Sequence, residues 1–444
     1  MRASLDDLFR PRRVAVWGAS ANDSSKLGNV LLRNVATAPA VDVSAVHPTA
    51  PRIDGVGASR EPPSDLNLAL ISLPAPAVEA AIEQAAKASA GAAIVLSSGF
   101  GEAGDTGRER QQRIAAIARD AGMRLVGPNC MGVVSALGER WLNATYFWSV
   151  PLQRGSIALI SQSGAFGGVF FDHVRRRRLG MARFVSVGNS ADVNETDVIE
   201  WLAADEETEV IGLFCESIGG GRRFVDAARA ATVRKPVVVL KSGKTAGGAR
   251  ASTGHTGALT SDHLVVQAAL RRAGAIEAAS TDEFFDLLHA AASPASAPRG
   301  GDRVAVITVS GGPSVLAADA VEAIGMRLPE PDAATRSAVA RLVPDFAALG
   351  NPFDLTPQCP PESFAPSVEA IYASGNFDRV VMIDCGIDSP ELATAVVDAQ
   401  RRHRLPTTAF LLDTPMIAER LVAAGIAVLS SAEAAVRAHR IGTR

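Results

Sequence analysis

The sequence has few of the residues that build disulfide frameworks or zinc modules. It has 444 residues and four cysteines. These are Cys130, Cys215, Cys359 and Cys385, which form no CxxC pair and lie far apart in the chain. This spacing predicts neither disulfides nor a zinc site. We therefore expect a cytoplasmic protein in a reducing compartment, with no tightly bound metal in this chain.

Aromatic residues and net charge are also scarce. Aromatic residues make up 5% of the chain and the formal net charge is −3. A nucleic-acid-binding protein normally presents a basic surface and aromatic platforms for bases, so we expect no nucleic-acid partner. No apolar run approaches the roughly 18 residues that a membrane span needs, and no apolar signal core follows Met1. We expect no membrane association.

What the sequence does contain is one pattern that occurs three times: a short apolar run, a turn rich in glycine and serine, and a helix-like segment. The three instances are VAVWGAS at 14–20, IALISQSGAFGG at 157–168 and VAVITVSGGPS at 304–314. Short runs that are almost continuously apolar are typical of parallel strands buried on both faces of a sheet. The sequence therefore predicts an α/β protein of three tandem doubly wound domains.

Composition places the boundaries of these domains. Small residues, proline and glycine replace the periodic pattern in AASPASAPRGGD at 291–302, which predicts a linker. A softer boundary lies near YFWSVPLQRG, before the second buried strand. We expect domains at 1–148, 149–292 and 303–444, with a linker at 293–302.

The first candidate site is the turn GASANDSSKLG at 18–28. Glycines let the backbone approach a ligand there, and the amides at the start of a helix favour phosphate. Tight packing of the helix on the strand explains such a turn equally well. The segments SSGFGEAG at 97–104 and GPNCMG at 127–132 should also follow strands. Because ligands of open α/β sheets bind at the carboxyl ends of the strands, these loops are expected to form one cleft.

The second domain offers a candidate anion site and a candidate nucleophile. Ser163 and Gly164 begin a predicted helix in SQSGAFGG, where free amides stabilise an anion, although an ordinary helix cap remains open. His255 lies between Gly254 and Gly257, and a neutral imidazole is a good nucleophile near neutral pH. Glu216, at the end of the strand VIGLFCE, is the candidate carboxylate to orient it.

Seven motifs, taken in order, resemble those of the NDP-forming (ADP-forming) acyl-CoA synthetases, which are related to the α subunit of succinyl-CoA synthetase. They are LFRPRRVAVWGAS, SSGFGEAG, GPNCMG, SQSGAFGG, CESIGG, STGHTGAL and VSGGPSVLAADA followed by NPFDL. The resemblance implies a Rossmann-like CoA-binding domain followed by two flavodoxin-like domains of the succinyl-CoA synthetase type. The second domain is then the one that carries a phosphohistidine.

The resemblance also implies roles for individual residues. His255 carries the phosphoryl group, Glu216 hydrogen-bonds this histidine, and Ser163, Gly164 and Gly254 bind phosphate. The residues implied to contact CoA are Gly18, Ser20, Ala21, Asn22, Leu96, Ser97, Ser98 and Asn129. A mobile loop is expected around His255, because its phosphoryl group must travel.

The implied reaction interconverts a carboxylic acid, CoA and ATP with acyl-CoA, ADP and phosphate. The nucleotide and its magnesium ion are expected on a separate ATP-grasp β-type subunit, so the protein would be a hetero-oligomer or a homodimer. Two alternatives stay open. One is an acyltransferase or amide synthetase that uses the same phosphohistidine with an amine acceptor, and the other is a noncatalytic regulatory protein that binds CoA.

Overall fold

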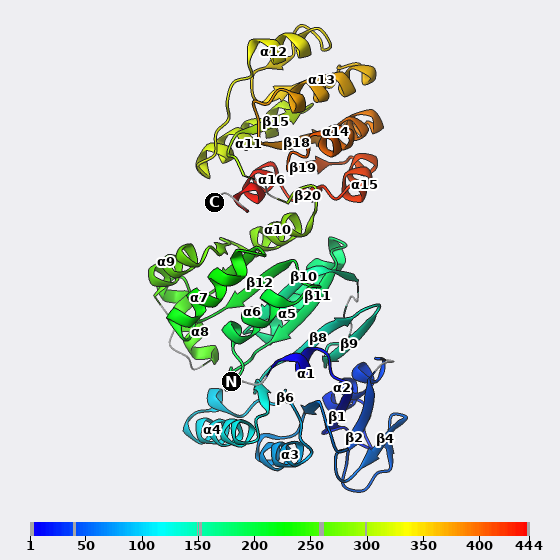
Figure 1. The fold of residues 1–444 in the computed structure, drawn as a ribbon, viewed down its shortest axis with the longest axis vertical. Helices are drawn as coiled ribbons and strands as arrows, with labels where there is room; N and C mark the ends of the chain where they lie inside the picture. Colours follow the sequence, from blue (N-terminus) through cyan, green and yellow to red (C-terminus); the bar gives the residue numbers. More distant parts are fainter. Residues whose placement is uncertain are drawn as a thin grey trace. The chain divides into compact units, whose positions relative to one another are not determined.

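The computed structural model describes residues 4–38, 41–148, 150, 153–256, 262–297 and 300–441, with no side chains for 252–256. The chain forms two compact units, Met1–Glu277 and Ala278–Arg444. The first unit contains two sheets and the second contains one (Figure 1). The predicted α/β class with three sheets is confirmed.

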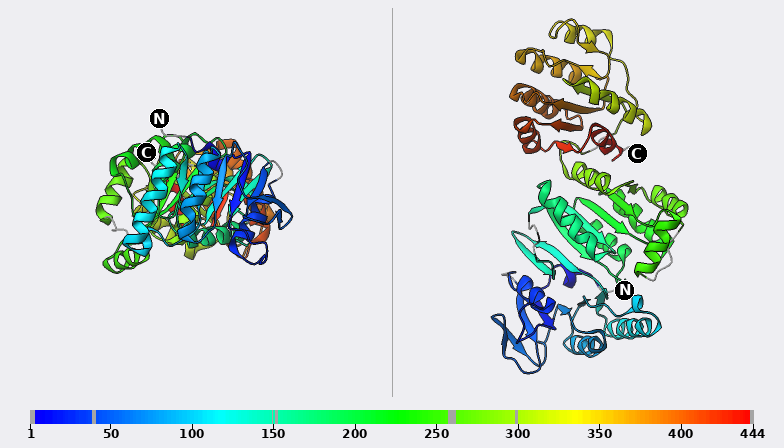
Figure 2. Two further views of the ribbon diagram at one scale, coloured as in Figure 1. Left: turned by 90° about the horizontal axis from the view of Figure 1, so that it is seen from below. Right: turned by 180° about the vertical axis from the view of Figure 1, so that it is seen from behind.

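The first sheet runs in the order β3-β4-β2-β1-β5-β6-β7, and its central pairs are parallel. Its strands are β1 (Arg13–Trp17), β2 (Asp42–Val46), β3 (Arg52–Ile53), β4 (Val56–Ser59), β5 (Leu68–Ile71), β6 (Ala92–Val95) and β7 (Arg124–Val126). Its helices are α1 (Asp6–Phe9), α2 (Leu27–Ala36), α3 (Ala75–Lys87) and α4 (Asp105–Asp120), with a short 3₁₀ turn at Gly101–Ala103. Helices α3 and α4 pack side by side (Figure 2). Because β1 lies between β2 and β5, the direction of winding reverses at β1, where such sheets bind ligands.

The second sheet runs in the order β14-β13-β12-β10-β11-β8-β9. Its strands are β8 (Gly132–Leu137), β9 (Arg140–Thr145), β10 (Arg154–Ser161), β11 (Met181–Ser186), β12 (Val210–Cys215), β13 (Val237–Lys241) and β14 (Ile276–Glu277). Its helices are α5 (Gly164–Arg176), α6 (Glu195–Ala204), α7 (Gly221–Thr232), α8 (Ala246–Thr256) and α9 (His263–Ala273). Strands β8 and β9 are antiparallel additions at one edge, although they precede the boundary expected near residue 148. Here the winding reverses at β10.

A continuous apolar core joins the first two sheets. It includes Leu8 and Phe9 of α1, strand residues of both sheets, and Val198 and Leu202 of α6. The ring of Phe9 stacks on Trp201 with centroids 4.1 Å apart. This shared core explains why the first two sheets belong to one unit.

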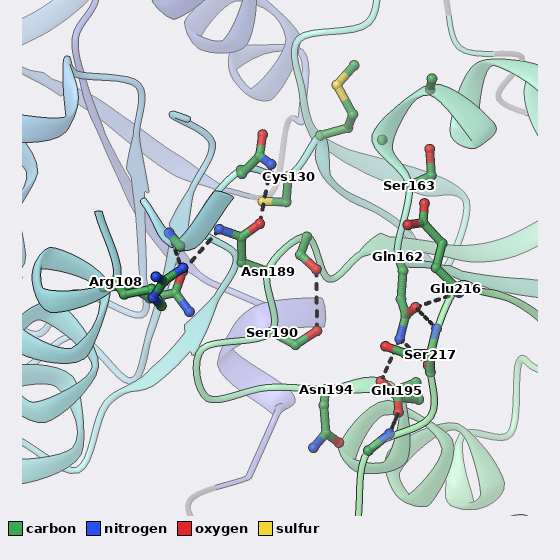
Figure 3. Close-up of a pocket in the computed structure, with 18 of the residues that line it drawn as sticks. Arg108, Cys130, Gln162, Ser163, Asn189, Ser190, Asn194, Glu195, Glu216 and Ser217 are labelled. Carbon is green, nitrogen blue, oxygen red and sulfur yellow. Dashed lines mark hydrogen bonds between the residues drawn. The ribbon is translucent and has the colours of Figure 1, made fainter. Parts of the chain in front are cut away.

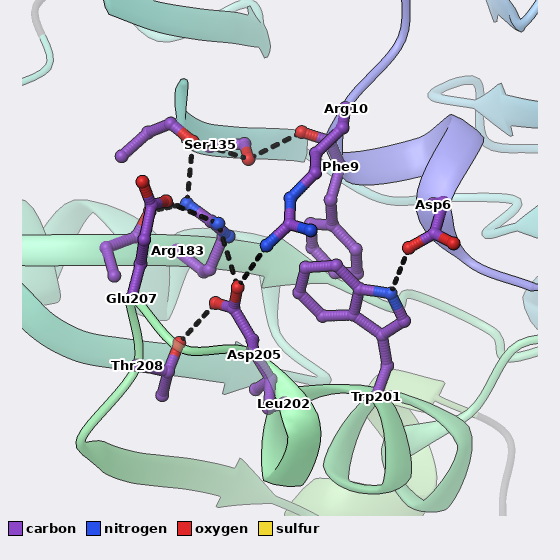
Figure 4. Close-up of polar contacts among 12 residues, drawn as sticks. Asp6, Phe9, Arg10, Ser135, Arg183, Trp201, Leu202, Asp205, Glu207 and Thr208 are labelled. Carbon is purple, nitrogen blue, oxygen red and sulfur yellow. Dashed lines mark hydrogen bonds and ion pairs between the residues drawn. The ribbon is translucent and has the colours of Figure 1, made fainter. Parts of the chain in front are cut away.

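A buried ionic network reinforces this joint (Figure 4). Asp205 has a fully buried side chain and accepts from Arg10 at 2.6 Å and from Arg183 at 3.1 Å. Arg183 is 1% exposed and also pairs with Glu207 at 2.6 Å. In addition, the indole N–H of Trp201 donates to Asp6 at 2.9 Å. The segment of α1 is thereby fixed to the second sheet's layer.

The second unit contains one sheet in the order β16-β17-β15-β18-β19-β20. Its strands are β15 (Val304–Thr308), β16 (Ala348–Leu349), β17 (Phe353–Asp354), β18 (Arg379–Cys385), β19 (Thr407–Leu412) and β20 (Ala427–Leu429). Its helices are α10 (Thr281–Ala292), α11 (Gly311–Ala323), α12 (Ala333–Ala340), α13 (Pro361–Ala373), α14 (Pro390–His403), α15 (Pro415–Ala423) and α16 (Ala432–Arg437), with a 3₁₀ turn at Ala438–Arg440. Helix α10 precedes the linker expected at 293–302, yet it packs on β20 and α16 and so belongs to this unit.

No helix in the described part of the chain has the length and apolar character needed to cross a bilayer.

Replacing Asp205 with alanine should destabilise the first unit by about 3 kcal/mol, because it removes one partner of a buried charged network. The exposed pair between Arg13 and Asp42 provides the matched control, since Asp42→Ala should cost less than about 1 kcal/mol. Denaturant-induced unfolding of both variants measures the difference. Equal midpoints for the two variants would show that the network adds no stability.

Stability of the second unit should depend on His439. This residue is 1% exposed, and burial together with the charge of Arg379 lowers its pKa to about 3. In the unfolded chain this histidine has a pKa near 6.5, so below that pH the unfolded chain binds more protons than the folded unit does. The contribution of His439 to the free energy of unfolding is therefore fully present above about pH 6.5 and is lost as the pH falls below that value. Compared with His439→Gln, the free energy of unfolding of the wild type should fall by up to about 1.4 kcal/mol for each unit by which the pH is lowered below that value. Unfolding curves at several pH values measure the slope, and parallel curves would contradict it.

Candidate active site

A cavity of about 560 Å³ lies within the first unit, where loops from its two sheets meet (Figure 3). The loop after β7 contributes Asn129, Cys130 and Met131. The loops after β10, β11 and β12 contribute three further sets: Gln162 to Ala165, Gly188 to Ser190 with Asn194 and Glu195, and Glu216, Ser217 and Gly219. Three of the predicted site residues, Ser163, Gly164 and Glu216, therefore share one cavity with Asn129.

The start of α5 forms one wall of this cavity. Ser163 is the N-cap residue, its side chain makes no capping hydrogen bond, and the first turn of α5 holds no acidic residue. Amides at such a helix start carry a partial positive charge that stabilises an anion. A Cβ atom on Gly164 would lie 2.5 Å from Cγ of Met131. Glycine thus lets the helix start approach the loop after β7.

Glu216 follows β12 and is 7% exposed. Lys241 ends the neighbouring strand, directly beside Cys215 in the parallel register. The lysine is 2% exposed, and burial lowers its pKa while the nearby Glu216 and Glu277 oppose that shift. The ammonium of Lys241 is therefore buried within electrostatic reach of Glu216.

Two further polar residues of this cavity were not among the predicted site residues. Glu195 begins α6, is 2% exposed, and accepts hydrogen bonds from Gln162 at 3.2 Å and from the amide of Gly219 at 3.2 Å. Burial raises the pKa of Glu195, and these hydrogen bonds offset the shift only in part. Gln162 lies within the motif SQSGAFGG, so its loop was identified but its role was not. The only sequence signal for Glu195 is its position directly after Asn194, the residue that caps α6.

Gly254 and His255 fall in the last turn of α8. The backbone there is helical, which differs from the loop expected around His255. The side chain of His255, and residues 257–261, lie outside the described part of the structure. The phosphohistidine role of His255 therefore stays a prediction, as does the phosphate contact of Gly254.

The predicted CoA-contacting residues gather at the carboxyl edge of the first sheet. Gly18 follows β1 with φ +95°, and a Cβ atom there would lie 2.1 Å from the carbonyl oxygen of Ser72 after β5. The hydroxyl of Ser97, after β6, donates to the carbonyl of Leu73. Leu96 is buried, whereas Ala21, Asn22 and Ser98 are exposed at this edge.

The turn at residues 18–28 combines the two explanations that the sequence left open. A Cβ atom on Gly28 would lie 2.2 Å from the carbonyl oxygen of Gly18, so Gly28 serves tight packing of α2 on the strand end. Ser20 shapes the turn, because its hydroxyl accepts from the amides of Asn22 and Asp23, each at 3.2 Å. The backbone of 20–23 is thus held in an exposed turn beside the strand ends.

Asn129 and Asn189 connect this edge to the cavity. The amide of Asn129 donates to the carbonyl of Ser97 at 2.9 Å, and its side chain donates to Asn189 at 3.3 Å. Asn189 in turn donates to Glu102 at 2.5 Å and to Gln111 at 3.0 Å. Burial opposes ionisation of Glu102, but the hydrogen bond from Asn189 and those from backbone amides outweigh it and lower the pKa. The predicted CoA edge and the candidate phosphate site are therefore parts of one connected surface.

Cys130 lies in the same loop but is not a candidate nucleophile. It is 2% exposed, and burial raises its pKa to about 12. The thiol stays protonated near neutral pH, and only the thiolate is strongly nucleophilic.

Comparisons with known proteins agree with this architecture. Models of a CoA binding domain, a succinyl-CoA ligase like flavodoxin domain and a ligase-CoA domain match residues 12–136, 154–291 and 304–402. The chain is 34% identical to the Pyrococcus furiosus protein named acetate–CoA ligase (ADP-forming) II subunit alpha, over 85% of this chain and 82% of that protein. It belongs to the ADP-forming acyl-CoA synthetase family.

Two other relatives match this ADP-forming acyl-CoA synthetase over different shares of their own length. A dinucleotide-forming acetyl-coenzyme A synthetase 1 from Ca. Korarchaeum cryptofilum, solved in complex with phosphate and ADP, superposes with a TM-score of 0.89 at 31% identity. The superposition covers 99% of this chain and 96% of that one. Acetate–CoA ligase (ADP-forming) I of Archaeoglobus fulgidus is 35% identical over 85% of this chain, but the match covers only 54% of that protein. The predicted family, fold class and α-subunit-like character of the synthetase are confirmed.

Gly188 should be essential to the close contact between the loop after β11 and the loop after β7. It has φ +55°, and a Cβ atom would lie 2.4 Å from the carbonyl oxygen of Pro128 and 2.5 Å from that of Asn129. Gly188→Ala should therefore displace the loop after β7, destabilise the unit by about 3 kcal/mol and abolish ligase activity. Gly122, with φ +71° and open space around it, is the matched control, for which alanine should cost about 1 kcal/mol. Thermal unfolding and activity measure both, and equal effects would contradict the close approach as the cause.

Proposed function

We propose that this chain is the CoA-binding, phosphohistidine-carrying subunit of an acid–thiol ligase. The observation that carries the proposal is the shared cavity, which brings Glu216 and the uncapped start of α5 together with Asn129 of the predicted CoA edge. An acyl phosphate needs such surroundings, because its phosphoryl group is anionic and its carbonyl must meet a thiol.

The proposed cycle has three transfers. The γ-phosphoryl group of ATP passes to His255, with ADP as the leaving group. A carboxylate oxygen of the acid then attacks phosphorus, so that the P–N bond breaks and an acyl phosphate forms. Finally the thiolate of CoA attacks the acyl carbon, the C–S bond forms, and inorganic phosphate leaves.

Each group of this chain has a distinct task in that cycle. The amides at Ser163 and Gly164 hold the phosphoryl oxygens, because they are donors in place before charge develops. Glu216 accepts a hydrogen bond from the N–H of the second ring nitrogen of His255, which stabilises the cationic phosphoimidazole. The edge formed by Gly18, Ser20 to Asn22 and Leu96 to Ser98 holds CoA, with Asn129 between CoA and the phosphate site.

ATP and its magnesium ion are proposed to bind a separate ATP-grasp subunit. The names of relatives support this. Two relatives that the chain matches over 82% and 86% of their own length are named as α subunits, which implies a further subunit. Magnesium would there neutralise part of the negative charge of the nucleotide's phosphates.

The proposal is tested by incubating the chain with a candidate ATP-grasp subunit and ATP labelled on the γ-phosphate. Acid-labile label should appear on His255 and be absent from His255→Ala. Glu216→Gln should lower the rate of labelling roughly 100-fold, because a charged partner of the reacting ring is lost. His403→Ala, which removes a surface partner of Glu369 in the other unit, should label like the wild type.

Discharge of the label distinguishes the alternatives. Consumption of CoA with an added carboxylic acid supports the ligase, whereas discharge that needs an amine and no thiol supports an amide synthetase. Labelling of His255→Ala at the wild-type rate would overturn the proposed phosphohistidine, and wild type that binds CoA but never labels points to the noncatalytic alternative.

A further inference from the structure

The loop that begins with Glu216 is shaped by one side chain from another strand end. Oε1 of Gln162 accepts from the amides of Glu216 at 2.7 Å and Ser217 at 3.1 Å. Nε2 of the same side chain donates to the carbonyl of Ser217 at 2.8 Å. Gln162 thus satisfies three backbone groups of this loop at once (Figure 3).

Glu195 completes the arrangement from a third element, the start of α6. One carboxylate oxygen accepts from Nε2 of Gln162 at 3.2 Å, and the other accepts from the amide of Gly219 at 3.2 Å. Both ends of the segment 216–219 are therefore held, one by Gln162 and the other by Glu195. The segment's hydrogen bonds run to side chains that themselves line the cavity.

Holding the loop with Gln162 and Glu195 requires the burial of a carboxylate, which is unfavourable. Glu195 is 2% exposed, and burying a carboxylate costs several kcal/mol unless its oxygens are satisfied. Burial correspondingly raises its pKa. The pair satisfies backbone N–H and C=O groups of the loop that an apolar side chain could not satisfy. The same hydrogen bonds fix the backbone from which the Glu216 side chain extends.

We propose that Gln162 and Glu195 are positioning residues of the ligase reaction: together they fix the Glu216–Gly219 loop and so orient the Glu216 carboxylate in the cavity. The inference rests on the proposed function for its chemical consequence, because Glu216 is the carboxylate that would orient His255. Its structural part, the fixation of the loop, is independent of that function.

The polarity of the pair makes it sensitive to isosteric changes. In Glu195→Gln, an amide group replaces one acceptor, so it faces either Nε2 of Gln162 or the amide of Gly219, and donor meets donor in both orientations. In Gln162→Glu, a carboxylate oxygen faces Glu195 and the carbonyl of Ser217. The double variant restores a donor and an acceptor between the two side chains with the polarity reversed.

Amide hydrogen exchange tests the structural part without any reaction. The amides of Glu216, Ser217 and Gly219 should be protected in the wild type and should exchange at least about tenfold faster in each single variant, because each loses a hydrogen bond of about 1.4 kcal/mol or more. Glu200→Gln is the matched control on the same helix, since its carboxylate pairs with Arg223 outside the cavity. Unchanged protection in both single variants overturns the inference.

Kinetics of the complete enzyme test the chemical part. Each single variant should lower kcat roughly 100-fold, as expected for a misplaced reacting group, and leave the KM values for ATP and CoA within about twofold. The double variant should regain at least about tenfold over the product of the single effects. Strictly multiplicative losses, or a loss confined to KM, overturn the positioning role.

The two proposals fail in different ways. Wild type without label on His255, but with protected loop amides that the variants release, contradicts the proposed phosphohistidine and leaves the loop fixation established. If the wild type is labelled normally and the variants have an unchanged kcat, the positioning role of Gln162 and Glu195 is contradicted. The proposed phosphohistidine is then unaffected.

Discussion

Parallel strands end at a common edge, and every described wall of the candidate site depends on that constraint. In the first sheet, the chain adds strands on one side of β1 with β2 and on the other side with β5 and β6. The loops after β1, β5 and β6 therefore meet at the carboxyl end of β1. In the second sheet, β10 has the same position, and the loops after β10 and β12 meet there. Residues that lie 55 positions apart in the chain, such as Gln162 and Ser217, thereby come within hydrogen-bonding distance.

The two edges form a single site because the sheets share one core. Strands β8 and β9 leave the first sheet's layer and extend the second sheet, and α1 packs its Phe9 ring on Trp201. Asn189 then bridges loops of both layers through Asn129 and Glu102. The predicted CoA edge and the candidate phosphate site at the start of α5 can cooperate only if their separation is fixed, and this shared core fixes it.

The sequence was sufficient to predict the class, the three sheets and most of the loops, because apolar strands and glycine-rich turns depend on local pattern. It did not place β8 and β9, since edge strands that change sheets carry no local signal of their partner. Gly18 and Gly164 were identified as turn glycines, and the structure gives each a specific close contact. Glu195 was missed because its role comes from burial and from partners 24 to 33 positions away.

The charge distribution around Glu216 fits the proposed role, in which phosphate is transferred at this site and not stored there. Fixed cations make a phosphate site bind more tightly, because hydrogen bonds from ionised donors are roughly twice as strong as those from neutral donors. Among the described residues that line the cavity, Glu195 and Glu216 are acidic and Arg108, whose guanidinium pairs with Asp105, is the only arginine or lysine. Attraction by the start of α5 is therefore balanced by nearby carboxylates. In the proposed cycle, a phosphoryl group would be stabilised there while its charge is spread in transfer and would not be retained as a tightly bound product.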